Sequence, residues 1–277
     1  MATPQEIKQE VRKRYGQAAK RTQQSSDCCG GPSANESEIS SNLYQTDELQ
    51  HLPREAVIAS LGCGNPVAVA DLHEGETVLD LGSGGGIDVL LSARRVGPQG
   101  KAYGLDMTDE MLALARENAS KAGVANVEFL KGEMEEIPLP EASVDVIISN
   151  CVVNLSPDKD AVLAETFRVL RPSGRLAIAD IVIRADLPAP VRQSMDAWTG
   201  CIAGALAEDD YKAKLASAGF EDVQIESFRE YTTGIFSAVV RARKPGGSEP
   251  RKGDWVPLKV VAGSADSGAC CGGTDCC

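Results

Sequence analysis

The sequence predicts an α/β domain in which helices cover both faces of a mostly parallel sheet. From residue 76 onward, short apolar runs of strand length alternate with longer segments of helical periodicity, as in repeated β-α-β units. A glycine-rich turn follows the first run, and an acidic residue ends the second. These observations favour a Rossmann-like, doubly wound sheet that binds a nucleoside ligand at the carboxyl ends of its strands.

The order of elements follows from the apolar runs and their breakers. Strands are expected at residues 77–81, 101–106, 126–131, 144–149 and 174–183, and again at 223–227 and 235–244. Helices are expected at residues 87–95, 109–121 and 157–170, with two or three more after the fifth strand. In the helix at 157–170, Ser156 is the expected N-cap and Pro157 the first helical residue.

Segments of different composition flank this domain, which we expect to cover residues 76–244 with an insertion near 185–207. Residues 1–75 are expected to form an N-terminal extension of helix and loop. Within it, Ile7, Val11 and Tyr15 recur every four residues among basic side chains, which predicts an amphipathic helix docked on the main domain. Residues 245–277 read as a linker and a short cysteine-rich tail.

Charge and composition exclude several classes of partner. The chain has 28 Lys+Arg against 40 Asp+Glu, and its net charge of -12 repels nucleic acids and anionic membranes. No apolar run approaches the roughly 18 residues that span a bilayer, and the N-terminus is too charged for a secretory signal. We therefore expect a cytoplasmic protein whose nine cysteines are reactive, ligating or buried.

The turn DLGSGGGID, residues 80–88, is the first candidate binding element. Gly82 and Gly84 allow close approach of the backbone to a ligand, and the following helix presents its first amides. Asp106 ends the second strand, where a carboxylate can accept both hydroxyls of a ribose. Asp80 precedes the glycines and favours a cationic ligand over a pyrophosphate, although an ordinary acid near a helix would look the same.

With this turn, the acid that closes the second strand and the loop KGEMEEIP after the third, residues 76–243 resemble class I S-adenosylmethionine-dependent methyltransferases. The resemblance implies S-adenosylmethionine as the cofactor. It also implies that the donor contacts Asp80, Gly82, Gly84, Asp106, Met107, Glu133 and Met134.

A cysteine marks the candidate acceptor side. Cys151 lies just beyond the fourth strand, at the mouth of the sheet, although free cysteines are often merely packed. Methylation of oxygen or nitrogen usually needs a base, but His51 and His73, the only histidines, precede the nucleotide core. An acceptor with an exposed lone pair, such as trivalent arsenic bound by soft thiolates, avoids this need.

The segments SNCVVNLSPDK, TGCIAGAL and LGCGNP, together with an N-terminal VRKRYG helix before a cysteine loop, resemble arsenite S-adenosylmethionine methyltransferases in the same order. The resemblance implies trivalent arsenic held by Cys151, Cys201 and a third thiol from Cys63 or the adjacent Cys28 and Cys29. It implies that the arsenic lone pair attacks the donor methyl, and that Asn150 and Tyr15 line the donor pocket. Cysteine thiols or a reductant such as thioredoxin or glutathione would then return the arsenic to the trivalent state.

Two alternatives remain open. A carbon methyltransferase acting on a quinone-like or lipid acceptor shares the donor fold but gives no role to Cys151 and Cys201. A metalloid-binding or redox-sensing protein would keep the nucleoside pocket without turnover. Cys63 could also be only a small residue in a tight turn, and the adjacent cysteine pairs of the tail could either capture metalloid or be dispensable.

Overall fold

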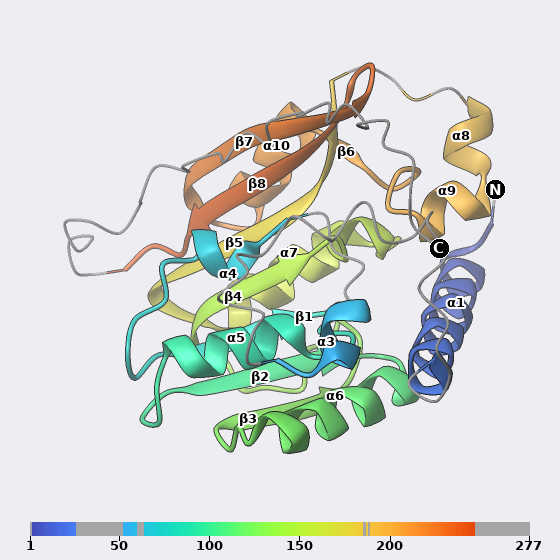
Figure 1. The fold of residues 1–277 in the computed structure, drawn as a ribbon. Helices are drawn as coiled ribbons and strands as arrows, with labels where there is room; N and C mark the ends of the chain where they lie inside the picture. The colour runs from blue at the N-terminus through green and yellow to red at the C-terminus, as the bar shows by residue number, and fades with distance from the viewer. Residues whose placement is uncertain (1, 26–51, 60–63, 185–186, 188, 247–277) are drawn as a thin grey trace, which may run out of the picture.

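The structure is a computed structural model that describes residues 2–25, 52–59, 64–184, 187 and 189–246. Its strands form one twisted sheet in the order β3-β2-β1-β4-β5-β8-β7, and a short β6 pairs with β5 (Figure 1). The strands are β1 (Thr77–Leu81), β2 (Lys101–Asp106), β3 (Val127–Lys131), β4 (Val144–Asn150), β5 (Leu170–Ile183), β6 (Leu206–Ala207), β7 (Glu221–Thr232) and β8 (Ile235–Arg243). The first five run parallel, whereas β8 is antiparallel to β5 and β7.

Helices lie on both faces of this sheet (Figure 1). They are α1 (Pro4–Ser25), α3 (Arg54–Ile58), α4 (Pro66–Val69), α5 (Ile87–Arg95), α6 (Asp109–Ala122), α7 (Lys159–Val169), α8 (Ala189–Gln193), α9 (Met195–Thr199) and α10 (Glu208–Ser217), with a 3-10 helix η1 at Val153–Leu155. Buried residues of α5 and α6 share one core cluster, and those of α7 and α10 share another. Within the described residues, no helix is both long and apolar enough to cross a lipid bilayer.

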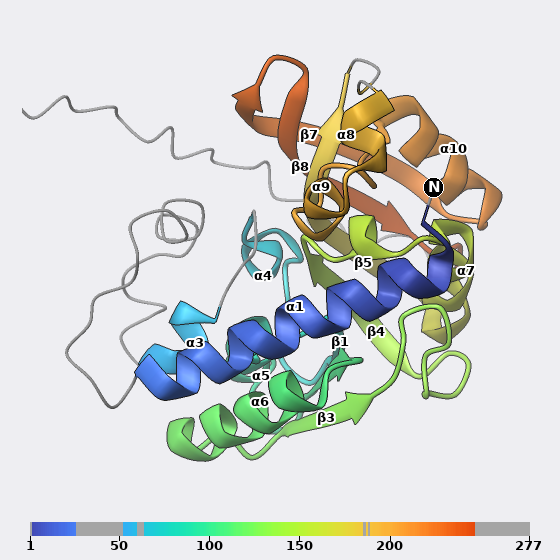
Figure 2. The same ribbon diagram turned by 90° about the vertical axis from the view of Figure 1, so that its right-hand side faces the viewer.

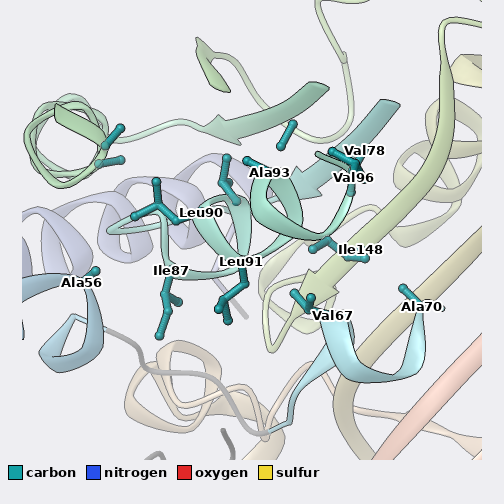
Figure 3. Packing of buried hydrophobic residues seen from close by; sticks show 14 of the residues in the cluster. Ala56, Val67, Ala70, Val78, Ile87, Leu90, Leu91, Ala93, Val96 and Ile148 are labelled. Carbon is teal, nitrogen blue, oxygen red and sulfur yellow. The ribbon is translucent and has the colours of Figure 1, made fainter. Parts of the chain in front are cut away.

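The two core clusters explain why the central strands are continuous apolar runs. Successive side chains of a strand point to opposite faces, so a strand covered on both sides needs an apolar residue at every position. In β4, Ile148 packs with α5 on one face, whereas Ile147 belongs to the cluster on the other face. Figure 3 shows Leu91 of α5 among the residues of the first cluster, near Val67 of α4.

The N-terminal helix crosses the end of the sheet and contacts α6 and α9 (Figure 2). Ile7 and Val11 are buried in a cluster with both Cys151 and Cys201, and Tyr15 packs against the same cluster. The predicted docking of an amphipathic helix is therefore confirmed, and the helix is longer than the apolar spacing indicates.

One predicted helix start is wrong. Helix α7 begins at Lys159 with Asp158 as its N-cap, because the Asp158 side chain accepts a hydrogen bond from the Ala161 amide. Ser156 is extended, with φ -71° and ψ 133°, as expected for a residue that precedes a proline. The predicted last residue of that helix, Leu170, instead begins β5.

Candidate active site

The turn after β1 brings backbone close to a neighbouring loop. Gly82 and Gly84 have φ values of 67° and 50°, and Gly86, at φ 87°, is the N-cap of α5. A Cβ atom at Gly82 would lie 2.3 Å from the Val152 side chain, so only glycine fits between the turn and the loop after β4. The glycine turn therefore lies directly against the segment that holds Cys151.

Carboxylates gather at the ends of β1 and β2. Asp106 accepts hydrogen bonds from the Gly84 amide (2.9 Å) and from the Thr108 amide (2.8 Å). Burial raises the pKa of Asp80 well above its usual range, and the charges of Asp88 and Asp106 raise this pKa further. Among the described residues, the charged neighbours that raise the pKa of Asp80 are thus both carboxylates, and this arrangement suits a cationic ligand.

These groups open into a pocket of about 990 Å³, including its solvent-exposed mouth. The pocket contains all nine of the predicted donor-binding residues in its lining: Tyr15, Asp80, Gly82, Gly84, Asp106, Met107, Glu133, Met134 and Asn150. Residues from α1, the glycine turn and the loops after β2, β3 and β4 therefore converge on one cavity, although they span 136 positions of the chain, from 15 to 150.

Helix α1 closes one side of the pocket through ion pairs. The Lys8 ammonium lies 2.6 Å from a Glu133 carboxylate oxygen and 3.1 Å from Glu135. Arg12 also pairs with Glu133, at 3.1 Å. The Lys8 hydrogen bond holds the pKa of Glu133 below its usual value, so Glu133 is ionised at neutral pH.

Asn150 links three parts of the site. Its Oδ1 accepts a hydrogen bond from the Gly64 amide (3.2 Å), and its Nδ2 donates to the Gly64 carbonyl (2.8 Å). The same Nδ2 lies 3.2 Å from a carboxylate oxygen of Asp88, the second residue of α5. Asn150 is therefore both a pocket residue and an anchor for the chain around Gly64.

Cys151 and Cys201 lie next to each other, although 50 residues separate them in the chain. The Cys201 thiol donates a hydrogen bond of 2.8 Å to the Cys151 carbonyl oxygen, and the Cys151 amide donates to the Ala179 carbonyl (2.7 Å). Both cysteines have left-handed backbones, with φ 58° and 64°, and each is 5% exposed. A non-glycine residue is strained in this conformation, and such strain concentrates at functional sites.

The two sulfurs differ in chemical state. Cys151 lines the pocket and is disulfide-bonded. Cys201 is a free, buried thiol, and burial raises its pKa far above the usual value for a cysteine. A hydrogen bond from Tyr15 acts in the opposite direction and favours the Cys201 thiolate.

Several pocket features were not predicted from the sequence. Tyr15 contacts the acceptor side as well as the pocket, and Asp88 is buried beside Asp80. Ser83 also lines the pocket, and its buried hydroxyl has no hydrogen-bond partner among the described residues. The signal for Asp88 and Ser83 is their position inside the glycine turn. The predicted third thiols, Cys28, Cys29 and Cys63, lie outside the described residues.

The fold and the pocket define a class I, S-adenosylmethionine-dependent methyltransferase. Residues 72–219, just over half of the chain, match a family described as "Methyltransferase domain". The chain is 44% identical to an arsenite methyltransferase of Halobacterium salinarum, over 87% of this chain and 68% of that protein. It is 36% identical to the arsenite methyltransferase of Aquipseudomonas alcaligenes, over 75% of this chain and 65% of that protein.

Among solved structures, the chain resembles an arsenic (III) S-adenosylmethionine methyltransferase from Chlamydomonas reinhardtii. The identity is 32%, the TM-score is 0.59, and the match covers 70% of each chain. The protein therefore belongs to the arsenite methyltransferase family, and S-adenosylmethionine is its cofactor. The chain spans about two thirds of the length of the two curated relatives.

Proposed function

We propose that this protein transfers methyl groups from S-adenosylmethionine to trivalent arsenic held by the sulfurs of Cys151 and Cys201. The observation that carries the proposal is the contact between these two cysteines at the wall of the donor pocket, where the Cys201 thiol lies 2.8 Å from the Cys151 carbonyl. The names of the relatives support the same acceptor, since they are arsenite methyltransferases. The general role would be arsenic detoxification.

The pocket residues fit the donor on chemical grounds. The Ser83 hydroxyl, which lacks a hydrogen-bond partner within the described residues, and the cluster around Asp80 offer a hydrogen-bonding group and negative charge to a cationic amino acid end. Asp106 would accept the ribose hydroxyls, and Glu133 with Met134 would flank the adenine. When bound, the donor supplies a methyl group attached to a positively charged sulfur.

Cysteine thiols would bind the arsenic by ligand exchange. For each thiol, an S–H bond and an As–OH bond break, an As–S bond forms, and the proton leaves with the hydroxide as water. Soft sulfur ligands suit arsenic better than oxygen does. The Tyr15 hydroxyl and the positive charges of Arg14 and Lys159 favour the anionic form of Cys201 and so assist its loss of a proton.

Cys151 must be reduced before it can bind arsenic, because its sulfur is held in a disulfide in the structure. Two electrons and two protons convert a disulfide into two thiols, and a dithiol or monothiol reductant such as thioredoxin or glutathione can supply them. The reductant therefore belongs to the proposed reaction as a partner. This requirement agrees with the cytoplasmic location expected from the cysteine content.

A third sulfur is proposed on the resemblance alone. Inorganic arsenite has three exchangeable hydroxyls, so Cys63 or one of the adjacent Cys28 and Cys29 would complete its coordination. These residues belong to the proposed N-terminal extension, residues 1–75, which precedes the proposed methyltransferase domain at 76–244 and the tail at 245–277.

The direct test is transfer of labelled methyl groups from S-adenosylmethionine by the reduced protein, with and without arsenite. We expect label in methylated arsenicals only when arsenite and a thiol reductant are both present. Transfer to a quinone-like or lipid acceptor without arsenite would indicate a carbon methyltransferase instead. Tight binding of both donor and arsenite without any transfer would indicate a metalloid-binding protein.

A further inference from the structure

A buried lysine lies behind the two acceptor cysteines. Lys159, the first residue of α7, is only 8% exposed. Its ammonium donates to the Ser156 carbonyl at 2.9 Å and lies 3.4 Å from the Asn154 carbonyl. These carbonyls belong to the segment that leaves Cys151 through η1, so the ammonium is bonded to the Cys151 loop.

The same ammonium contacts the segment that leads to Cys201. It lies 5.3 Å from the centre of the Trp198 ring, within the range of a cation–π interaction. The Trp198 carbonyl in turn accepts a hydrogen bond of 3.0 Å from the Cys201 amide. Lys159 therefore stands between the chain after one acceptor cysteine and the chain before the other.

The two segments are packed in close contact with each other. A Cβ atom at Gly204 would lie 2.0 Å from the Asn154 carbonyl oxygen and 2.7 Å from the Trp198 ring. The Asn154 amide donates to the buried Asp180 carboxylate at 3.0 Å, and the Asn154 side chain donates to the Ile181 carbonyl at 2.7 Å. The Cys151 loop is thus hydrogen-bonded to β5 through Asn154 and packs closely against the turn that follows Cys201.

A lysine at position 159 destabilises the fold in two ways, so filling space alone does not explain its presence. A positive charge in the first turn of a helix opposes the helix dipole, and burial disfavours the charged form. Burial lowers the pKa of Lys159 to about 8, and Asp180 is the group that most opposes this effect. An apolar side chain of similar length would avoid both costs, so the ammonium has a role that an apolar residue cannot fill.

We propose that Lys159 is a positioning residue for the arsenic site, which fixes the Cys151 loop and the Cys201 turn at the separation that lets both sulfurs bind one arsenic atom. This inference rests on the function proposed above and assigns to it a residue that touches neither donor nor arsenic. Besides its charge effect on the Cys201 thiol, it acts by position, because one ammonium bonds two carbonyls after Cys151 and contacts the ring before Cys201.

The test compares Lys159→Met with Lys159→Arg and with the control Lys214→Met. Lys214 lies on α10 and pairs with the exposed Asp160 at 2.8 Å, so its substitution removes a lysine charge nearby without touching either cysteine segment. For each reduced protein, arsenite is titrated while protection of Cys151 and Cys201 from alkylation is followed by mass spectrometry. Donor affinity is measured by calorimetry, and KM for arsenite and kcat are measured separately.

We expect Lys159→Met to raise the arsenite concentration for half-protection and the KM for arsenite about tenfold or more, the size of effect that loss of one charge-assisted contact produces. Donor affinity should stay within about twofold of the parent, because Lys159 does not line the donor pocket. Lys159→Arg should recover most of the loss, since a guanidinium can still meet the carbonyls and the ring. The Lys214→Met control should behave as the parent.

Parent-like arsenite protection in Lys159→Met would overturn the proposal, and so would an equal loss of donor affinity, which would indicate a general structural role. If Lys159→Met does not fold, Trp198→Leu removes the ring but keeps the lysine, and it should raise the arsenite KM in the same direction by a smaller factor. An unchanged KM there would also overturn the proposal. A parent protein that shows no arsenite protection at all would instead overturn the function on which this inference rests.

Discussion

The proposed donor half of the pocket and the proposed acceptor half are built in different ways. The donor half consists of strand ends and glycines, so the left-handed backbone at Gly82, Gly84 and Gly86 costs little. The acceptor half places cysteines in left-handed backbone at residues 151 and 201, in irregular segments supported by the buried Lys159 and Asp180. Each such cysteine costs of order 1–3 kcal/mol where a glycine would not.

The difference shows where this chain concentrates its chemistry. The donor half uses a geometry that any doubly wound sheet provides at its carboxyl edge. The acceptor half depends on contacts between distant segments, such as the hydrogen bond from the Cys201 thiol to the Cys151 carbonyl. Each substitution in the donor half should therefore weaken S-adenosylmethionine binding only in part, whereas substitution of an acceptor sulfur should abolish arsenic methylation.

The largest expected effect is that of Cys151→Ser or Cys201→Ser. Each should abolish arsenic methylation and leave donor affinity near the parent value, because a hydroxyl keeps the shape but is a harder and protonated ligand. Methylated arsenic is measured by chromatography with elemental detection, and donor binding by calorimetry. A variant that methylates at the parent rate would show that two sulfurs are not needed.

A smaller effect is expected in the donor half for Asp106→Ala. A charge-assisted hydrogen bond contributes about 1.5–3 kcal/mol, so donor affinity should fall roughly tenfold or more. The matched control is Asp109→Ala, three residues away, whose carboxylate is 72% exposed and pairs with Lys131. Calorimetry that finds equal donor affinity in both variants would remove Asp106 from the donor site.

Asp80→Asn should separate stability from binding. The pKa of Asp80 is raised in the folded state, so between the unfolded and folded pKa values the folded protein binds more protons, and stability falls as pH rises. The variant removes this cost and should melt higher than the parent without donor at neutral pH, by about 2–4 °C for each kcal/mol gained. Its donor affinity should fall, because the carboxylate that faces the cation is lost.

The measurement for Asp80→Asn is thermal unfolding between pH 5 and 8, with and without S-adenosylmethionine. The gap in melting temperature between variant and parent should widen as pH rises, because the parent alone carries the titrating carboxyl. A variant that is less stable than the parent without donor would contradict the assignment of Asp80 as a destabilising, ligand-facing acid.

The smallest effect is expected for Lys8→Ala, which removes the ion pairs from α1 to Glu133 and Glu135. Partly exposed pairs contribute about 0–1 kcal/mol and are screened by salt, so donor affinity should weaken about two- to threefold at low salt and little at high salt. Lys13→Ala is the control, because Lys13 is 64% exposed and, in the part of the chain that the structure describes, pairs with Glu10 of the same helix alone. A loss that persists at high salt would mean that Lys8 contacts the donor directly.

Most of the fold could be predicted from the sequence, because its signals are local. The bounds predicted for β1 and β2 agree with those in the structure at both ends. The glycine turn and Asp106 mark the edge of the sheet where the pocket lies. The start of α7 could not be predicted, since Ser156 and Asp158 are both good N-caps and an extended backbone at Ser156 is compatible with either start.

The acceptor surroundings were the least predictable part of the site. A cysteine after β4 indicates an acceptor, but the contact of Tyr15 with Cys201 joins segments 186 residues apart. Lys159 looks like an exposed first-turn residue in the sequence, but in the structure it is buried, with its ammonium over the Trp198 ring. Such contacts depend on how α9 and the turn after it pack against α1 and η1, and periodicity carries no information about that.

The left-handed backbone of the two acceptor cysteines also has a consequence for sequence design. A procedure that optimises stability alone would place glycine or asparagine at positions 151 and 201, because these residues adopt φ values near 60° most easily. The backbone at both positions would relax, and the protein would lose both sulfurs. A glycine substituted at either position is therefore a cleaner way to delete a thiol than alanine, since it removes the sulfur while relaxing the chain that held it.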